Sequence, residues 1–158
     1  MGKMRNIILA LSVLAAQLPS VASEGEKGRL PYLMGCVGCH GEAGVTIAQK
    51  VPDLKDQIGY FLHLPEGRAY LVRLPNVAFA PISDQQLAEM MNYMVFTLGG
   101  SSAPKDAKPY SAAEVGKLRK QPLTEVPLFQ YRGALVERLI SDYQAPEAMR
   151  LYGQGLYD

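Results

Sequence analysis

The sequence has no tryptophan, no low-complexity tract and no internal repeat, and it contains only two cysteines and two histidines. So few thiols and imidazoles argue against a structural zinc site, which needs about four ligands at metal-binding spacing. Neither sign of charge is in excess, with 16 basic and 15 acidic residues. A chain without a basic excess is not expected to bind nucleic acid. Strand signals are also few, which favours an all-α fold.

The two cysteines are followed at once by one of the histidines, in the segment Cys36-Val37-Gly38-Cys39-His40. This C-x-x-C-H spacing is the pattern for covalent attachment of haem. Two thiols at this separation can form thioethers to both vinyl groups of one porphyrin, and His40 can then bind the iron through an imidazole nitrogen. A structural disulfide, a dithiol redox motif and half of a zinc site are the alternatives, but the flanking sequence lacks the α/β pattern of a thioredoxin-like protein. We therefore predict one covalent haem c, held by Cys36, Cys39 and His40.

The first 23 residues are typical of a secretory signal peptide. Lys3 and Arg5 precede a short apolar stretch over residues 7–16, and small residues suited to cleavage follow at Val21-Ala22-Ser23. An uncleaved N-terminal anchor is the alternative, although the stretch is short for a membrane span. Without residues 1–23 the chain has 14 basic and 15 acidic residues, a net charge near −1, and no later apolar run long enough to cross a bilayer. Haem c is attached outside the cytoplasm, so we expect a periplasmic protein with no membrane span after cleavage.

Residues 24–99 are expected to form one small helical domain. A first helix is expected over residues 26–34, with Pro31 an awkward residue inside it, then a loop over 41–55 and one or two short helices over 59–74. Ser83-Asp84-Gln85-Gln86 is a capping box that opens a final helix, which Gly99-Gly100 ends. That final helix carries an apolar stripe, consisting of Leu87, Met90, Met91, Met94 and Leu98.

Together these motifs resemble the class I c-type cytochromes over residues 24–99. The strongest element is Tyr32 followed by the C-x-x-C-H segment. Val51-Pro52-Asp53-Leu54 resembles the family's Gly-Pro-x-Leu segment, whose Pro carbonyl accepts the Nδ1–H of the haem-binding histidine, so the resemblance implies that Pro52 does so for His40. Residues 82–87 with Tyr93 are similar to the start of the family's final helix, whose aromatic residue packs on the first helix. The resemblance implies an all-α, cytochrome c-like domain around one covalent haem.

The sequence departs from the family at the sixth iron ligand. The family usually carries this ligand as a Met a few residues before the final helix, but Asn76 stands there and no Met lies between Met34 and Met90. Four residues can replace it: Met90, Met91, Met94 and His63. A vacant, water-bound or Asn-lined distal site is the other possibility. The distal ligand is left unassigned, and it matters because axial ligands change haem potentials over about 0.8 V.

Two arginines of the middle segment are candidates to bind the haem propionates. Buried carboxylates need partners, and Arg68 or Arg73 can pair with a carboxylate through two hydrogen bonds. The alternative is that each is an ordinary solvated arginine.

Residues 100–158, called the extension below, are not part of a minimal class I domain. They are expected to contain a linker, a helix opened by the capping box Ser111-Ala112-Ala113-Glu114 and ended by Pro122, and a helix from Pro127 to about Tyr143. Residues 105–120 are locally basic by +3, with five basic residues against two acidic ones: Lys105, Lys108, Lys117, Arg119 and Lys120, against Asp106 and Glu114. The extension either covers the domain or serves as a docking arm for a redox partner with an acidic face.

The resemblance implies an electron carrier and not an enzyme. We expect a periplasmic monohaem cytochrome that transfers single electrons from a periplasmic dehydrogenase to a downstream cytochrome or oxidase of the respiratory chain. A first alternative is a fixed haem subunit of a dehydrogenase complex, with the extension as its assembly surface. A second is a ligand-binding or peroxidase-like haem protein with an open distal site, in which His63 is the only histidine available as a distal acid or base.

Overall fold

The computed structural model describes residues 24–46 and 51–152, so the predicted signal peptide lies outside the described residues. Within these two ranges every regular element is a helix and no strand occurs. The prediction of an all-α fold is therefore confirmed. None of the described helices is long and apolar enough to cross a membrane.

Three short helices form the N-terminal part: α1 (Glu24–Lys27), α2 (Arg29–Gly35) and α3 (Val37–His40). The single helix expected over residues 26–34 is divided at Gly28, which lies directly before α2. Pro31 lies in the first turn of α2, where backbone N–H groups have no partner within the helix, so its missing N–H costs no helical hydrogen bond.

The middle segment contains a 3-10 helix, η1 (Ile58–His63), followed by α4 (Pro65–Arg73) and α5 (Pro75–Ala78). Pro65 and Pro75 stand at the starts of α4 and α5, and the residue before each has an extended ψ of 130°. Proline disfavours the helical conformation in the residue before it, which explains why this segment forms separate helices instead of one.

The final helix of the predicted domain begins as expected. Ser83 is the N-cap of α6 (Asp84–Asn92), and both hydrogen bonds of the capping box with Gln86 are present. The helix then continues as a π-helical segment, η2 (Tyr93–Leu98), before the 3-10 turn η3 (Gly100–Ser102), in which Gly100 has a φ of 53°. Each residue of the predicted stripe is buried: Leu87, Met90, Met91, Met94 and Leu98.

The N-terminal helices pack closely on this final helix at Gly28. A Cβ atom added at Gly28 would lie 2.0 Å from the carbonyl oxygen of Glu89 in α6, so the approach requires glycine. One turn further on, the rings of Tyr32 and Tyr93 lie 5.5 Å apart, which is the contact between the first and final helices that the resemblance implied.

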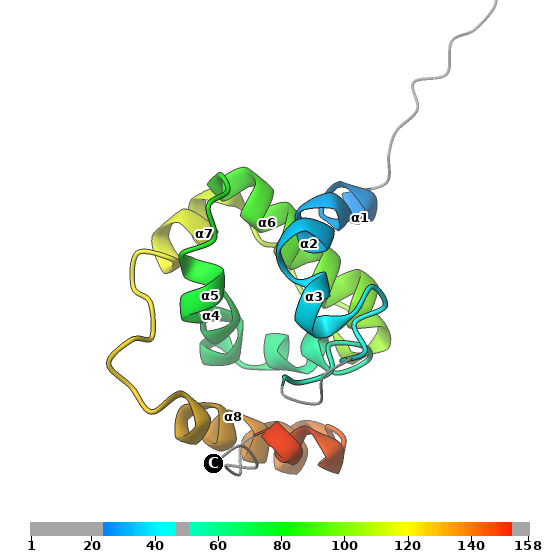
Figure 1. The fold of residues 1–158 in the computed structure, drawn as a ribbon. Helices are drawn as coiled ribbons and strands as arrows, with labels where there is room; N and C mark the ends of the chain where they lie inside the picture. The colour runs from blue at the N-terminus through cyan, green and yellow to red at the C-terminus, as the bar shows by residue number, and fades with distance from the viewer. Residues whose placement is uncertain (1–23, 47–50, 153–158) are drawn as a thin grey trace, which may run out of the picture.

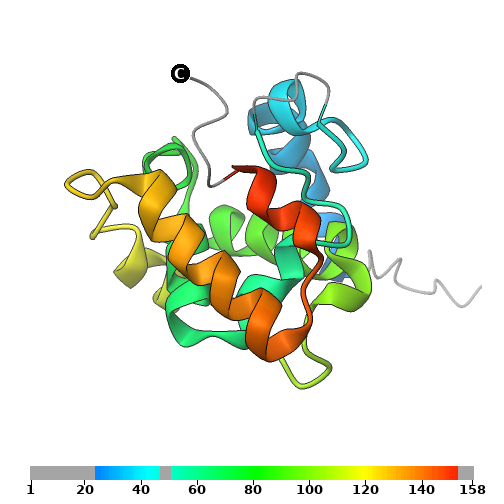
Figure 2. The ribbon, with the colours of Figure 1, turned by 90° about the horizontal axis from the view of Figure 1, so that it is seen from below.

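The extension forms α7 (Ala112–Leu118), α8 (Leu128–Tyr143) and η4 (Glu147–Tyr152). Its buried residues belong to the same hydrophobic core as those of the domain: Tyr110, Val115, Leu123, Leu135, Val136, Leu139, Ala145 and Met149. The helix α8 contacts η1 and η4 and lies across one side of the molecule, as Figure 2 shows. The extension therefore packs against the preceding helices through a shared hydrophobic core.

Aromatic rings join α8 to the middle segment. Tyr131 stacks on Tyr70 at 5.8 Å, and Tyr70 stacks in turn on Phe61 at 5.4 Å. At the other end of α8, Tyr143 lies 4.7 Å from His63.

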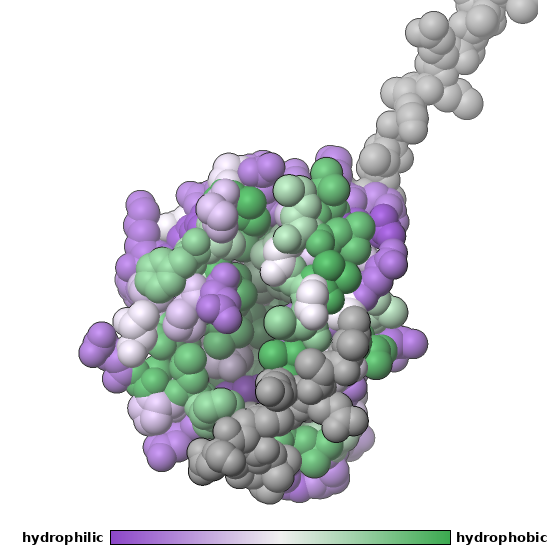
Figure 3. Space-filling model, viewed as in Figure 1, coloured by the Kyte–Doolittle hydropathy of each residue, from purple (hydrophilic) through white to green (hydrophobic). Residues whose placement is uncertain are grey.

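The helices are arranged around a centre (Figure 1). In this view α3 lies on one side and α4 and α5 on the other, with α6 and α7 above and α8 below. The space-filling view in the same orientation is hollowed between α3 and α5, and much of the hollow is lined by apolar residues (Figure 3). The C-x-x-C-H segment thus lies at the edge of this hollow.

Candidate haem-binding site

Cys36, Cys39 and His40 are brought together by one short turn of helix. Cys36 is the residue between α2 and α3, and its carbonyl accepts hydrogen bonds from the backbone N–H groups of Cys39 and His40 at 3.2 and 3.0 Å. Gly41 then ends α3 with a φ of 69°, a left-handed conformation that glycine adopts without strain. Both thiols are free, with Cys36 half-buried and Cys39 exposed. They are thus available for attachment to a porphyrin.

The imidazole of His40 is held by the backbone of Pro52. Its Nδ1 atom lies 3.0 Å from the Pro52 carbonyl oxygen. A carbonyl only accepts hydrogen bonds, so Nδ1 carries the proton and Nε2 keeps its lone pair. Burial lowers the pKa of His40 and outweighs the hydrogen bond to Pro52 and the nearby Asp53, which raise it. The neutral imidazole that binds iron is therefore the favoured form.

The loop that carries Pro52 is held at both ends. The Gly44 carbonyl accepts hydrogen bonds from the N–H groups of Leu54 and Lys55 at 2.7 and 3.0 Å, and the N–H of Thr46 donates to Asp53 at 2.6 Å. Before the loop, the Tyr32 hydroxyl donates to the Gly41 carbonyl. Burial raises the pKa of Tyr32 to about 12, so this donor keeps its proton over the physiological range.

The residues around the hollow fit a haem. Two free thiols one turn apart, a neutral imidazole with Nε2 available and an apolar lining are the chemistry that a covalently bound porphyrin needs. By contrast, no group of three or more His, Cys, Asp or Glu side chains that could hold a metal ion occurs within residues 24–46 and 51–152.

The four candidates for the distal ligand are placed differently. The sulfur of Met90 lies 3.9 Å from the thiol of Cys36, while Met91 and Met94 are 0 and 4% exposed within the core. His63 lies between the rings of Tyr60 and Tyr143, at 5.9 and 4.7 Å. Asn76, in α5 where the family usually has its Met, is exposed.

The two arginines considered for the propionates bind the extension instead. Arg68 forms two hydrogen bonds to the Glu114 carboxylate, at 2.6 and 2.8 Å, and a third to the Lys108 carbonyl. Arg73 donates to the Gln121 carbonyl at 2.6 Å. Both guanidinium groups thus bond residues of the extension that lie 40 or more residues later in the chain.

One further arginine of the extension bonds the segment between α5 and α6. Arg119, one of the basic residues of the extension, donates to the carbonyl groups of Ala78, Ala80 and Ile82. No local pattern predicts this role, since the acceptors are backbone groups 37 to 41 residues earlier in the chain.

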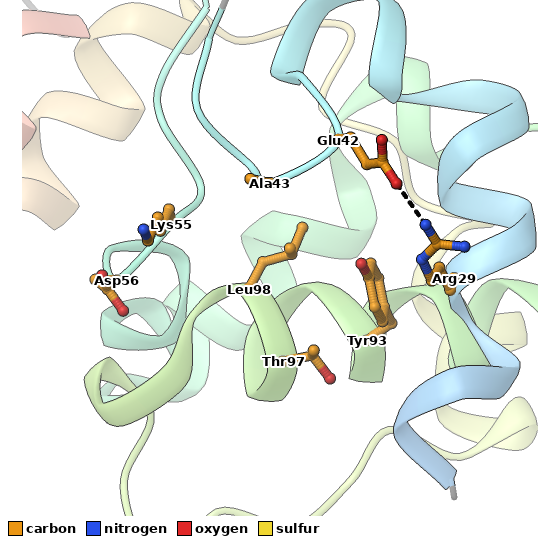
Figure 4. Close-up of a pocket in the computed structure, with 8 residues that line it drawn as sticks. All are labelled: Arg29, Glu42, Ala43, Lys55, Asp56, Tyr93, Thr97 and Leu98. Carbon is orange, nitrogen blue, oxygen red and sulfur yellow. Dashed lines mark hydrogen bonds and ion pairs between the residues drawn. The ribbon is translucent and has the colours of Figure 1, made fainter. Parts of the chain in front are cut away.

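A second concavity lies elsewhere and contains none of the predicted haem residues. It is an open pocket of about 470 Å³ between the N-terminal helices, the 41–56 segment and η2. Figure 4 shows the Arg29–Glu42 ion pair at one end and Lys55 and Asp56 at the other. The chemistry-bearing residues Cys36, Cys39 and His40 do not line it.

Two known c-type cytochromes are similar to this chain. The chain is similar to cytochrome c-552 of Thermus thermophilus, with 28% identity over 107 residues that cover 56% of this chain and 82% of the relative. Cytochrome c-552 from a particular strain of the same organism gives the same identity and length of match, over 72% of that relative. No protein-family model and no solved structure matches the chain. The similarity to these two cytochromes supports the interpretation of the chain as a c-type cytochrome.

Proposed function

We propose that the protein is a class I cytochrome with one covalent haem c that transfers single electrons in the periplasm. The main support is the turn that presents two free thiols and a neutral imidazole beside an apolar hollow. A bound haem supplies reversible one-electron exchange at its iron. The chain's own part is to attach, orient and shield that group.

Each residue of the site has a distinct part in this proposal. Cys36 and Cys39 attach the porphyrin through thioethers, and His40 binds the iron on the proximal side. Pro52 accepts the Nδ1–H of His40, which fixes the ring orientation and raises the donor strength of Nε2. The domain is then residues 24–99, with residues 1–23 as the signal peptide and the extension as a covering layer.

Electron transfer needs partners of compatible potential. We propose a periplasmic dehydrogenase as donor and a downstream cytochrome or oxidase as acceptor. A fixed subunit of a dehydrogenase complex is the related alternative, in which the outer surface of the extension contacts the complex.

A ligand-binding or peroxidase-like role is the second candidate, because the usual distal Met is missing. The sulfur of Met90 lies 3.9 Å from the thiol of Cys36, which would attach the porphyrin through a thioether. The distal wall at α5 carries Asn76 and no Met. We therefore propose that the sixth position is not filled by a Met of residues 74–81.

The test of covalent haem uses the two histidines as a matched pair. Exported wild-type protein should retain its haem in acid–acetone and give the pyridine haemochrome spectrum of a haem with two thioethers. His40→Ala should abolish most of the folded holoprotein, since haem supplies much of the core of so small a domain. His63→Ala should keep the haem. Free extraction of haem from the wild-type protein would overturn the proposal.

A carbon monoxide difference spectrum of the reduced holoprotein separates the two candidate functions. An electron carrier with a saturated iron should bind CO slowly, and it should exchange electrons with protein partners quickly. Rapid CO binding together with fast peroxide turnover would favour the ligand-binding or peroxidase-like role.

A further inference from the structure

We propose that Arg119 of the extension is a positioning residue that fixes residues 78–84 and so limits access of small ligands to the distal side of the haem. The inference rests on the proposed function, because it concerns the wall that faces His40 across the hollow. It adds a role for the extension that an electron carrier of this class does not require.

The guanidinium of Arg119 uses all three of its nitrogens on this segment. Nε donates to the Ala78 carbonyl at 2.9 Å, Nη2 to the Ala80 carbonyl, and Nη1 both to the Ile82 carbonyl at 2.9 Å and to the Asp84 carboxylate at 3.1 Å. The Arg119 side chain is only 16% exposed. A guanidinium that is largely buried needs hydrogen-bond acceptors, so these four bonds form a specific arrangement and not a transient surface contact.

These contacts join the end of one helix to the start of the next. Ala78 is the last residue of α5, where carbonyl groups lack partners within the helix, and Asp84 is the first residue of α6. Between them the N–H groups of Phe79, Ala80 and Ile82 donate to nearby carbonyl groups at 3.0, 3.2 and 2.8 Å. Arg119 adds bonds to the carbonyl side of this segment and ties it to the extension.

The helix that carries Arg119 is seated for this contact. A Cβ atom added at Gly116 would lie 2.2 Å from a carboxylate oxygen of Asp84, so a side chain there would displace the carboxylate that Arg119 binds. Separate contacts dock the rest of the extension, including the ion pair between Arg68 and Glu114. The packing of α7, which ends directly before Arg119, thus positions this side chain beside residues 78–84.

Residues 78–84 lie across the hollow from His40, so their position bears on access to the distal side (Figure 1). A Met ligand in residues 74–81 would itself tie this segment to the iron, but the chain has none there. Arg119 holds this segment instead, through hydrogen bonds from the extension to its backbone carbonyl groups. Without it, α5 and residues 79–83 should open more often and expose the distal side.

Two measurements on the holoprotein test the inference, and one of them needs no haem chemistry. Phe79 is 64% exposed and lies within the segment, so chymotryptic cleavage after Phe79 reports how often the segment opens. The rate of CO association with the reduced haem reports distal access. Arg119→Lys keeps the charge but cannot make four hydrogen bonds. The loss of about one charge-assisted hydrogen bond should raise the rate of cleavage after Phe79 and the rate of CO association roughly tenfold.

Arg73→Lys is the matched control, because Arg73 also bonds the extension but does not contact residues 78–84. It should change both rates less than about twofold. Gly116→Ala is the second perturbation, since its methyl group would displace the Asp84 carboxylate from Arg119 while leaving Arg119 intact, and it should act in the same direction as Arg119→Lys. Pyridine haemochrome spectra of every preparation show whether haem is attached, so a failure of the proposed function is seen separately from a failure of this inference.

Three results would overturn the inference. Unchanged cleavage after Phe79 in Arg119→Lys would mean that Arg119 does not fix the segment. Faster cleavage with unchanged CO association would mean that the segment does not control distal access. Equal effects of Arg119→Lys and Arg73→Lys would assign the change to general docking of the extension.

Discussion

Replacement of Gly28 by alanine should strongly destabilise the protein through a single close contact. The backbone of Gly28 has an ordinary helical conformation, with φ of −81° and ψ of −10°, so alanine brings no conformational strain there. Its Cβ atom, however, would lie 2.0 Å from the Glu89 carbonyl oxygen, 2.5 Å from the Glu89 carbonyl carbon and 2.7 Å from the Cβ of Tyr93. Because two of these atoms belong to backbone, no rotamer change can relieve the overlap.

The magnitude follows from the displacement that the methyl group demands. A Cβ atom is essentially never closer than 3.0 Å to such a neighbour, so α2 and α6 must separate by about 1 Å at the contact. Overpacking a core usually costs about 1 to 3 kcal/mol. Separating α2 from α6 also loosens the packing of Tyr32 on Tyr93, so the cost should lie at the upper end of this energy range. We therefore expect a loss of about 3 kcal/mol in the free energy of unfolding.

Gly35 provides the control within the same helix. It is the last residue of α2, and nothing lies within 4 Å of a Cβ atom added there. Gly35→Ala should be neutral or stabilise by up to about 0.5 kcal/mol, since alanine costs less backbone entropy than glycine in a helix.

Urea unfolding of the two holoprotein variants, followed by far-ultraviolet circular dichroism, measures the difference. For a chain of this length the expected gap corresponds to roughly 10 °C in Tm. If Gly28→Ala is no less stable than Gly35→Ala, then the helix crossing is not set by the missing side chain and the reasoning is refuted.

Three further changes test other parts of the structure. Burial raises the pKa of Tyr32 to about 12, so the fold favours the neutral phenol. The free energy of unfolding should therefore fall as the pH rises from about 10, the ordinary pKa of tyrosine, to about 12. Tyr32→Phe should lose about 1 kcal/mol of stability at neutral pH, and its stability should fall less steeply at alkaline pH when measured by urea unfolding. A double-mutant cycle with Arg68→Gln and Glu114→Gln should give a coupling free energy of about 1 kcal/mol. The two side chains form a bidentate pair, but they are 19 and 32% exposed, which limits its strength. A coupling near zero would show that this ion pair does not help to dock the extension. Met90→Leu should leave the ferric absorption spectrum of the holoprotein unchanged, whereas loss of a far-red Met–iron band would identify Met90 as the distal ligand.

The elements that the sequence predicted well are those specified by neighbouring residues. The capping box at Ser83 fixes the start of α6 through contacts within one turn, and the stripe from Leu87 to Leu98 shows which face is buried. The contact between His40 and Pro52 spans only 12 residues, and the family resemblance implies it.

What the sequence did not predict depends on contacts between distant segments. Arg68 and Arg73 have the chemistry to bind a carboxylate, but their partners follow from where the extension docks, 40 or more residues later. No local pattern distinguishes Arg119 from the other basic residues of the extension, because its acceptors are carbonyl groups that every residue possesses. The close approach of α6 to Gly28, where the first helix is divided, is likewise recorded by no local pattern.

The stacked rings between α8 and the middle segment give the protein an optical signal of its own. With no tryptophan in the chain, near-ultraviolet dichroism of the polypeptide comes mainly from tyrosine and phenylalanine held in asymmetric surroundings. Phe61, Tyr70 and Tyr131 form one such stack, and Tyr143 meets His63 at the other end of α8. The fine structure of the tyrosine band should therefore record whether α8 is seated, independently of the far-ultraviolet signal of the helices. A spectroscopist can thus follow detachment of α8 without attaching any label.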